Sequence, residues 1–289
     1  MPFDKHAVDR ALETFSSPGV SGNPETTLVV SLTSYPARMG TLHYALYTLL
    51  NQTLKPDAVI LWLAEEEFPG GERDLPEKVL SLRRNGLGIR WTRNLRSYKK
   101  LVPALGAFPE SVIATADDDF LYEADWLERL YADYERNERQ VMVYAHRAHT
   151  ISLSDKGHLL SYRTWDHAAW NTPGVSFLNF ATGGGGSLYP PGALHPEVRN
   201  EDLFLELAPH ADDVWFWAMA VLNGTRTRVV ENFLALPTHL ETGSGGLYAH
   251  NVGQGGNDAQ LARVLSRFPE IAVNIMVEQA VLRRSRGAS

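Results

Sequence analysis

The chain has 289 residues, of which 44% are hydrophobic, so it can bury the core of one large α/β domain or of two small ones. Charged residues make up 21% and the formal net charge is -7, which excludes the basic surface that non-specific nucleic-acid binding needs. The sequence contains no cysteine, which excludes disulfides and thiolate chemistry, so any metal must bind oxygen or imidazole.

The ends of the chain bear on its location. The N-terminal sequence MPFDKHAVDR lacks the apolar core of a signal peptide, so we expect a cytoplasmic protein. The most apolar stretch, Val214 to Leu222, is far shorter than the roughly 20 residues that span a bilayer, so we expect no membrane span. The basic C-terminal LRRSRGAS follows an apolar, helix-like run, and is interpreted either as a solvated tail or as a segment for peripheral membrane attachment.

Strands and helices alternate in the first half of the chain, after an N-terminal helix and a linker rich in Ser, Gly and Pro. Hydrophobic periodicity predicts strands at 27–32, 58–63, 87–91 and 111–115. The helices predicted between them lie at 42–50, 76–82 and 101–107. Because such alternation is typical of parallel sheets, we predict an α/β fold with a mainly parallel central sheet flanked by helices. We expect one domain over residues 1–289.

The second half is less regular. It predicts helices at 124–136 and 212–222, strands at 141–145 and 227–230, and one or two closing helices. Two glycine-rich segments, ATGGGGSLYPPGALH and ETGSGGLYAHNVGQGGND, are interpreted as mobile walls of a cleft or as ordinary surface loops.

Polar residues follow each of the first four predicted strands. Ligands of parallel sheets bind at the carboxyl ends of the strands, so these residues should share one edge. In strand order they are Ser34, Tyr35 and Arg38; Glu65 and Glu66; Arg93 to Lys100; and Asp117, Asp118 and Asp119.

The three adjacent aspartates indicate a cation site. Like charges this close raise each other's pKa, and a divalent cation removes that cost. Oxygen ligands suit magnesium or manganese, which commonly bridge to substrate phosphates. The alternative is a solvated turn in which an aspartate caps the helix that starts near Glu123.

The segment RNLRSYKKL supplies Arg93, Arg96, Lys99 and Lys100, which are interpreted as phosphate clamps or as the solvated face of a helix. Neither GxxxxGK[ST] nor GxGxxG follows the first strand, so a P-loop NTPase and a Rossmann dehydrogenase lose their usual support.

A second acidic pair, Asp212 and Asp213, opens an apolar helix that contains Trp215 and Trp217. A carboxylate beside aromatic bulk can serve as a general base, and Asp213 is the preferred candidate. N-capping of the helix is the competing interpretation.

Several histidines are candidates for a site. His239 and His250 flank or lie within the late glycine-rich segment, where an imidazole could complete a metal site, and His250 is preferred. Another four histidines lack tight zinc-site spacing and are interpreted as a polar wall for an acceptor: His146, His149, His158 and His167.

The sequence resembles bacterial glycosyltransferases of family two, which have the A-type fold. The resemblance covers about 27–260. It rests on VVSLTSYPAR, the bend QTLKPD, the strand-terminal ATADDD, the loop GGGGSLYPPG and the helix start ADDVWFW. It implies a half-Rossmann nucleotide-sugar-binding half at about 27–120, an acceptor and catalytic half at about 121–260, and C-terminal helices at 261–289.

The resemblance also implies roles for residues. Asp213, with Asp212, would supply the catalytic base, and Asp117 and Asp119 would hold Mn2+ or Mg2+, with His250 as the candidate third ligand from its place in the glycine-rich segment. The implied nucleotide-sugar contacts are Ser34, Tyr35, Arg38, Glu65, Lys99, Lys100, Asp117, Asp118, Gly184, Gly185 and Gly186. Two departures weaken the assignment of nucleotide base and stereochemistry: Ala-Glu-Glu-Glu follows the second strand, and the acidic pair is Asp-Asp rather than Glu-Asp.

The hypothesis is therefore an inverting transfer of a sugar from a nucleotide-diphospho-sugar, with UDP as the expected nucleotide, to the hydroxyl of a free or lipid-linked saccharide in polysaccharide biosynthesis. Two alternatives stay open. One is a metal-dependent nucleotidyltransferase or phosphohydrolase, and the other is a non-catalytic saccharide-binding protein.

Overall fold

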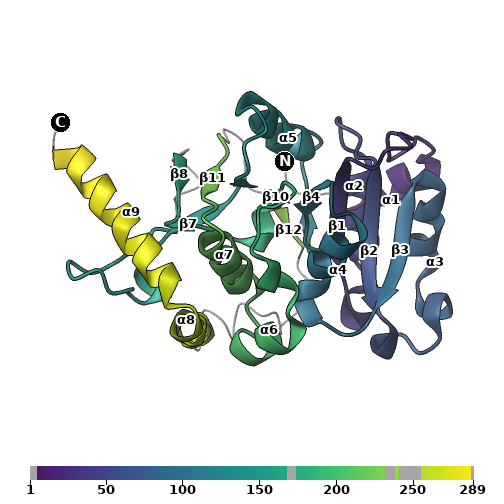
Figure 1. The fold of residues 1–289 in the computed structure, drawn as a ribbon. Coiled ribbons are helices and arrows are strands. Elements are labelled where there is room, and N and C mark those ends of the chain that lie inside the picture. The colour runs from purple at the N-terminus through teal and green to yellow at the C-terminus, as the bar shows by residue number, and fades with distance from the viewer. Residues whose placement is uncertain (1–4, 168–173, 232–237, 241–254, 288–289) are drawn as a thin grey trace. The chain divides into compact units, whose positions relative to one another are not determined.

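The computed structural model describes residues 5–167, 174–231, 238–240 and 255–287 (Figure 1). The chain folds into two compact units. The first unit contains Met1–Ala132 and Ala235–Thr242, and the second contains Asp133–Leu234 and Gly243–Ser289.

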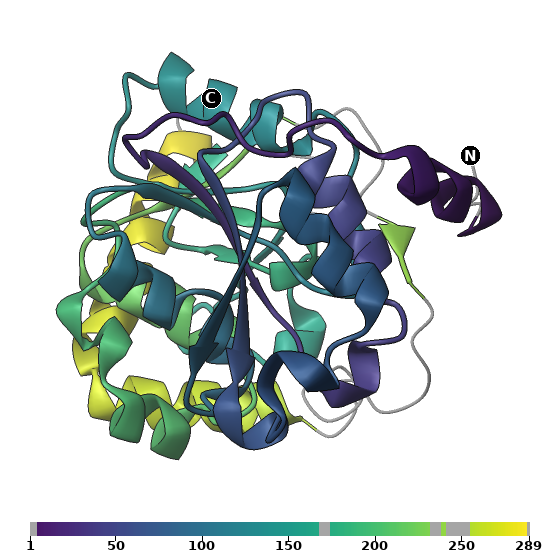
Figure 2. The ribbon, with the colours of Figure 1, turned by 90° about the vertical axis from the view of Figure 1, so that its right-hand side faces the viewer.

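The first unit is built on four parallel strands in the order β3-β2-β1-β4. They are β1 (Leu28–Thr33), β2 (Ala58–Ala64), β3 (Leu87–Thr92) and β4 (Val112–Thr115). The helices of this part of the chain are α1 (Lys5–Thr14), α2 (Leu42–Leu50), α3 (Glu77–Leu80), α4 (Val102–Ala107) and the start of α5 (Trp126–Arg136). Figure 2 shows the strands, coloured purple to blue, twisted relative to one another, as expected for L-residues.

Burial explains why these segments form strands. The central strands β1 and β2 are buried along nearly their whole length, as parallel strands covered on both faces must be. The partner strand β3 is largely half-buried. Helix α2 buries most of its side chains, including Leu46 and Leu49. Apolar β-branched runs and a helix with a broad apolar face therefore make the core of this unit.

The bend QTLKPD before β2 has a structural role. Gln52 donates to the carbonyls of Thr48 and Glu123 at 2.9 and 2.8 Å, and accepts from the Leu127 backbone N–H at 2.9 Å. Asp57 accepts from the backbone N–H groups of Thr27 and Leu28 at 2.8 and 2.9 Å. Gln52 therefore ties α2 to the segment that follows the aspartate triplet.

The second unit has a mixed sheet in the order β10-β6-β11-β8, in which only the β6–β11 pairing is parallel. A separate antiparallel pair is formed by β7 and β9. The strands are β6 (Val143–Ala145), β7 (Ala148–Thr150), β8 (Gly174–Ser176), β9 (Asn179–Ala181), β10 (Ser187–Tyr189) and β11 (Thr227–Val229). The helices are α6 (Glu201–Leu207), α7 (Asp212–Leu222), α8 (Gly256–Arg267) and α9 (Pro269–Gly287).

The α/β class with a mainly parallel sheet is confirmed, and the predicted elements of the first half agree with the structure to within a few residues. The predicted helix at 76–82 is instead one α-helical turn, α3, followed by a 3-10 segment at Ser81–Asn85. The loop predicted around the GGGG run is wrong in part, because it contains β10. In the described part of the chain, no helix has the length and apolar character needed to cross a membrane.

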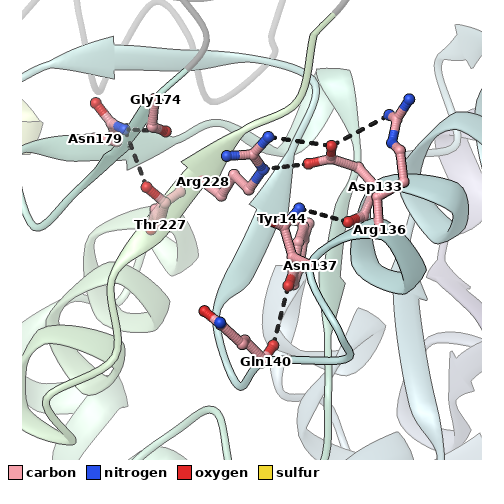
Figure 3. Close-up of polar contacts among 9 residues, drawn as sticks. All are labelled: Asp133, Arg136, Asn137, Gln140, Tyr144, Gly174, Asn179, Thr227 and Arg228. Carbon is pink, nitrogen blue, oxygen red and sulfur yellow. Dashed lines mark hydrogen bonds and ion pairs between the residues drawn. The ribbon is translucent and has the colours of Figure 1, made fainter.

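An ion pair between a buried carboxylate and a half-buried arginine joins α5 to β11 in the second unit (Figure 3). Asp133 is 2% exposed and accepts from Arg228 Nε at 2.5 Å and from Arg228 Nη2 at 3.2 Å. The hydrogen bond with Asp133 raises the pKa of Arg228. Arg136, which is 63% exposed, donates to the same carboxylate at 3.2 Å.

We predict that Asp133→Ala lowers the free energy of unfolding of the second unit by about 3 kcal/mol or more, because it leaves the Arg228 guanidinium without its carboxylate partner. Arg136→Ala is the matched control and should cost no more than about 1 kcal/mol, because an exposed ion pair is screened by water. Urea unfolding followed by tryptophan fluorescence measures both. Equal effects of the two variants would contradict this account of the ion pair.

Candidate functional site

The carboxyl ends of the four parallel strands carry the polar residues that the sequence predicted for one edge. Ser34 follows β1, a 3-10 turn at Glu65–Glu67 follows β2, a 3-10 turn at Arg96–Lys100 follows β3, and the aspartate triplet follows β4. Three of these residues contact the triplet directly: Ser34, Arg38 and Lys100.

Each aspartate of the triplet binds a different partner. Lys100 Nζ lies 2.7 Å from Asp117 Oδ1, and Arg38 Nη2 lies 3.0 Å from Asp119 Oδ2. Between them, Asp118 Oδ2 accepts from the Ser34 hydroxyl at 2.5 Å. Two of the three carboxylates are therefore balanced by protein cations, and the third is held by a neutral donor.

The basic segment after β3 is buried rather than solvated at its end. Lys99 is 2% exposed and its Nζ lies 2.7 Å from Glu67 Oε2, while Lys100 is 6% exposed. The interpretation of these two lysines as a solvated helix face is therefore wrong. Arg93 and Arg96 are exposed, and Arg96 has a left-handed backbone with φ 56.

A buried hydroxyl in the sheet fixes the position of Lys100. Ser31 of β1 is fully buried, and its hydroxyl donates to the Lys100 carbonyl at 2.6 Å. Trp62 Nε1 of the neighbouring strand β2 donates to the Ser31 oxygen at 3.1 Å. Two central strands thus hold the backbone from which the Lys100 side chain reaches Asp117.

The carboxyl of Asp118 has a strongly raised pKa. Burial, together with the charges of Asp119 and Asp117, raises its pKa to about 7, against the opposing effects of the Ser34 hydrogen bond and Arg38. The like-charge cost expected for adjacent aspartates thus adds to a larger desolvation cost. At neutral pH this carboxyl is poised between its two protonation states.

Asp119 also contacts a residue from far along the chain. His239 Nε2 lies 3.3 Å from Asp119 Oδ2, and the Leu240 backbone N–H donates to the Asp119 carbonyl at 2.7 Å. These contacts belong to the short antiparallel pair β5 (Phe120–Leu121) and β12 (Thr238–His239). The structure thus brings His239, whose side chain is 55% exposed, to the triplet.

Within the described ranges, no group of three or more His, Cys, Asp or Glu side chains is arranged to hold a metal ion. Asp119 and His239 supply two adjacent donors, but Asp119 Oδ2 is also paired with Arg38, as Asp117 is with Lys100. The third expected ligand, His250, lies outside the described residues.

Tyr35 and Glu65, which were also predicted to contact the nucleotide, differ in their contacts with neighbouring side chains. Tyr35 is 40% exposed and its hydroxyl accepts from Arg38 Nε at 3.3 Å. Glu65 is exposed, and the glutamate of this turn that binds a lysine is Glu67.

In the second unit, Asp213 binds the glycine-rich segment. Both of its carboxylate oxygens accept from the Gly183 backbone N–H, at 3.1 and 3.3 Å. The N-cap of α7 is Ala211, which forms no side-chain capping bond, so neither aspartate occupies the capping position. Asp213 also lines a cavity of about 10 Å³ beside Phe216 and Trp217, which confirms its position against aromatic side chains.

The GGGG run is packed rather than open. Gly183–Gly185 forms a 3-10 turn, and Gly185 and Gly186 are buried. A Cβ on Gly185 would lie 2.4 Å from Arg147 Cβ, and Gly186 has φ 85, so both positions require glycine. This segment therefore packs closely against Arg147. Gly184 is half-buried, and most of the second glycine-rich segment lies outside the described residues.

The four histidines expected to form a polar wall are divided. His146 and His149 are buried, and burial lowers the pKa of His149 to about 3. His149 Nδ1 lies 3.0 Å from the Tyr162 hydroxyl. His158 and His167 are exposed.

Sequence reasoning missed two residues, one that binds the basic segment after β3 and one that binds the triplet. Glu67 pairs with buried Lys99, and the Tyr122 hydroxyl accepts from the Asp117 backbone N–H at 2.7 Å. Burial raises the pKa of Tyr122 well above its usual value, so this hydroxyl stays protonated. The run of three glutamates and the position of Tyr122 five residues after Asp117 were visible signals, but neither specifies a partner.

We predict that Asp118→Asn stabilises the protein increasingly as the pH rises from 4 to 8. The folded carboxyl ionises near pH 7 and the unfolded one near 3.8, so the wild-type protein loses stability relative to the variant through this window. Thermal unfolding in EDTA should give a difference that grows to about 4 kcal/mol by pH 8, since each unit of pKa difference contributes about 1.4 kcal/mol. A difference that does not change with pH would contradict the raised pKa.

Among known proteins, this chain is similar in structure but not detectably in sequence family. No family model matches the sequence, and no curated protein matches it. Among solved structures, residues 1–349 of TarS from S. aureus are similar, with a TM-score of 0.49 and 15% identity over 74% of this chain. The match covers 60% of that chain, which is less than two thirds of its length.

Proposed function

We propose that the protein is a metal-dependent glycosyltransferase that moves a sugar from a nucleotide-diphospho-sugar, UDP-linked in the first instance, to a saccharide hydroxyl in polysaccharide biosynthesis. One observation carries the proposal. Three consecutive carboxylates at the end of a parallel strand lie in contact with Lys100 and Arg38, both of which are nearly buried. Mixed charge of this kind at a strand end fits a diphosphate and its counter-ion.

Lys100 and Arg38 are the residues proposed to bind the phosphates. Lys100 and Arg38 come from different elements and reach the triplet from opposite ends, at Asp117 and Asp119. An entering diphosphate would share these cations with the carboxylates, because Arg and Lys both bind phosphate oxygens through charge-assisted hydrogen bonds. Ser34 and Tyr35, beside them, would border the nucleoside.

The donor set fits a divalent cation that keeps open positions for substrate. Mg2+ and Mn2+ commonly bind through one or two carboxylates together with substrate phosphates and water. Asp119 would be the first ligand, with Asp117, and the adjacent imidazole of His239 favours manganese over magnesium. When bound, such an ion would neutralise the departing diphosphate.

Asp213 is the proposed base. Its carboxylate is half-buried, accepts from the Gly183 N–H and lies beside Phe216 and Trp217. Such a carboxylate could take the proton from the attacking hydroxyl of the acceptor. The proposed displacement forms the new glycosidic bond on the opposite face from the departing diphosphate and therefore inverts the anomeric configuration.

We predict that the Asp117→Ala/Asp119→Ala variant loses transfer by about a thousandfold or more, since both the cation and the phosphate site depend on these carboxylates. The assay offers UDP-, GDP- and CDP-sugars with oligosaccharide acceptors and identifies the products by mass spectrometry. Retained transfer by the variant would refute the proposal. Nucleotide or phosphate release without a new glycoside would indicate a nucleotidyltransferase or phosphohydrolase, and metal-independent saccharide binding without turnover would indicate a binding protein.

We predict that Lys100→Gln weakens binding of the nucleoside diphosphate about tenfold to a hundredfold, because it removes a buried cation from the phosphate site. Lys78→Gln is the matched control, since Lys78 also pairs with an aspartate, Asp9, at 2.9 Å, but on α3 and with 58% of its side chain exposed. Isothermal titration should show unchanged affinity for the control. Similar affinities for both variants would remove Lys100 from the phosphate site.

We predict that Asp213→Asn lowers kcat for transfer at least a hundredfold while nucleotide affinity stays within about twofold, because the change removes the proton acceptor and leaves the first unit intact. The amide keeps an oxygen that can accept from the Gly183 N–H. An unchanged kcat would show that another group takes the proton.

A further inference from the structure

Helix α9 (Pro269–Gly287) is apolar on two opposite faces. One face packs into the second unit through Ile271 and Ile275, which are 0% and 1% exposed. The other face is also apolar, with Val273 and Val277 exposed by 53% and 58%. Amphipathic surface helices normally place charged residues on the exposed side, as α5 does with Glu128, Glu135 and Arg136. The exposed side of α9 therefore has the composition of a contact surface.

Polar contacts fix which face of α9 is outward. Glu278 accepts from Arg226 Nη2 at 3.0 Å, and Asn274 donates to the Val221 carbonyl at 3.1 Å. Gln279 donates to the Leu153 carbonyl at 3.3 Å. These contacts hold α9, the yellow helix of Figure 1, along one side and leave the valine face outward.

The outward face follows a coiled-coil pattern. Its residues are separated by three, four, three and four positions, which is the a/d spacing of a heptad. In order, they are Glu270, Val273, Val277, Ala280 and Arg284, all of them exposed. We call this set the α9 stripe. Val281, 57% exposed, lies beside it.

The charges at the ends of the α9 stripe are opposite and equally placed. Glu270 precedes Val277 by seven residues, and Arg284 follows it by seven. If two copies of the helix cross antiparallel at Val277, Glu270 of each copy comes opposite Arg284 of the other. A two-fold axis through the crossing makes both ion pairs at once, because the same surface then serves both partners.

We propose that the α9 stripe is the contact between two copies of this chain, packed antiparallel about Val277. The valines and Ala280 form the apolar seam, and the two Glu270–Arg284 pairs set the direction of the helices. An anionic membrane is the competing occupant of an apolar, partly basic helix. The stripe favours a second copy, because Glu270 lies in it and would be repelled by an anionic surface, and because Arg283 is already paired with Asp155 at 3.0 Å.

The first test is the mass of the full chain in solution. Analytical ultracentrifugation across roughly 1–100 µM should show a monomer–dimer equilibrium, as expected for a small helix-pair interface. Val277→Arg should weaken the dimer about a hundredfold, because it places two like charges at the crossing. Val141→Arg, which changes another valine that is 50% exposed but lies outside the stripe, should leave the equilibrium unchanged.

The second test is an exchange of charges, in which folding of every variant is checked by circular dichroism. Glu270→Arg and Arg284→Glu should each weaken the dimer about tenfold, and the double variant should regain the wild-type constant, because it restores both opposite-charge pairs. A wild-type chain that is monomeric throughout would overturn the proposal, as would a dimer insensitive to Val277→Arg or a double variant no tighter than the single ones. A monomer that binds phosphatidylglycerol vesicles, and loses that binding in Val277→Arg, would assign the stripe to a membrane instead.

Discussion

The structure of the candidate site depends on one electrostatic constraint, the placing of three adjacent carboxylates at the end of β4. Each must be balanced or protonated, and the protein meets this demand with partners from three elements: Ser34 after β1, Arg38 in the turn that follows, and Lys100 after β3. Lys100 is buried, and Ser31 holds its carbonyl, while burial and the neighbouring charges raise the pKa of Asp118. Under the proposed function, this site would exchange its internal partners for a phosphate and a cation.

The two units contribute different chemistry to the proposed reaction. The first holds charges of both signs at the edge of a parallel sheet, which suits the recognition of a diphosphate. The second unit holds the Asp213 carboxylate in the first turn of the buried helix α7. This carboxylate accepts from the Gly183 N–H, in a turn where Arg147 packs too closely on Gly185 for a larger residue to fit. In the proposed reaction, the first unit would bind the diphosphate through charges that can be exchanged, and Asp213 would act as a base held in a fixed position.

Much of the fold could be predicted from the sequence, because β1, β2, α2 and α7 are long, apolar and bounded by turn residues. The strands of two or three residues, such as β5, β9 and β12, are too short to show a period, so they were missed. At the site, the triplet and Lys100 stood out by charge and position. Their pairing did not, because the contacts of Ser34 with Asp118, of Glu67 with Lys99 and of His239 with Asp119 join residues far apart in sequence.

The most direct test of the central claim, that the triplet and its cations bind a nucleoside diphosphate with a divalent metal, is calorimetric titration. UDP, GDP and CDP would each be titrated into the purified, folded protein in manganese and again in EDTA. The account predicts saturable binding of one nucleotide, with UDP expected, that disappears in EDTA. Absence of binding by all three nucleotides in manganese, or binding that is equally tight in EDTA, would contradict it.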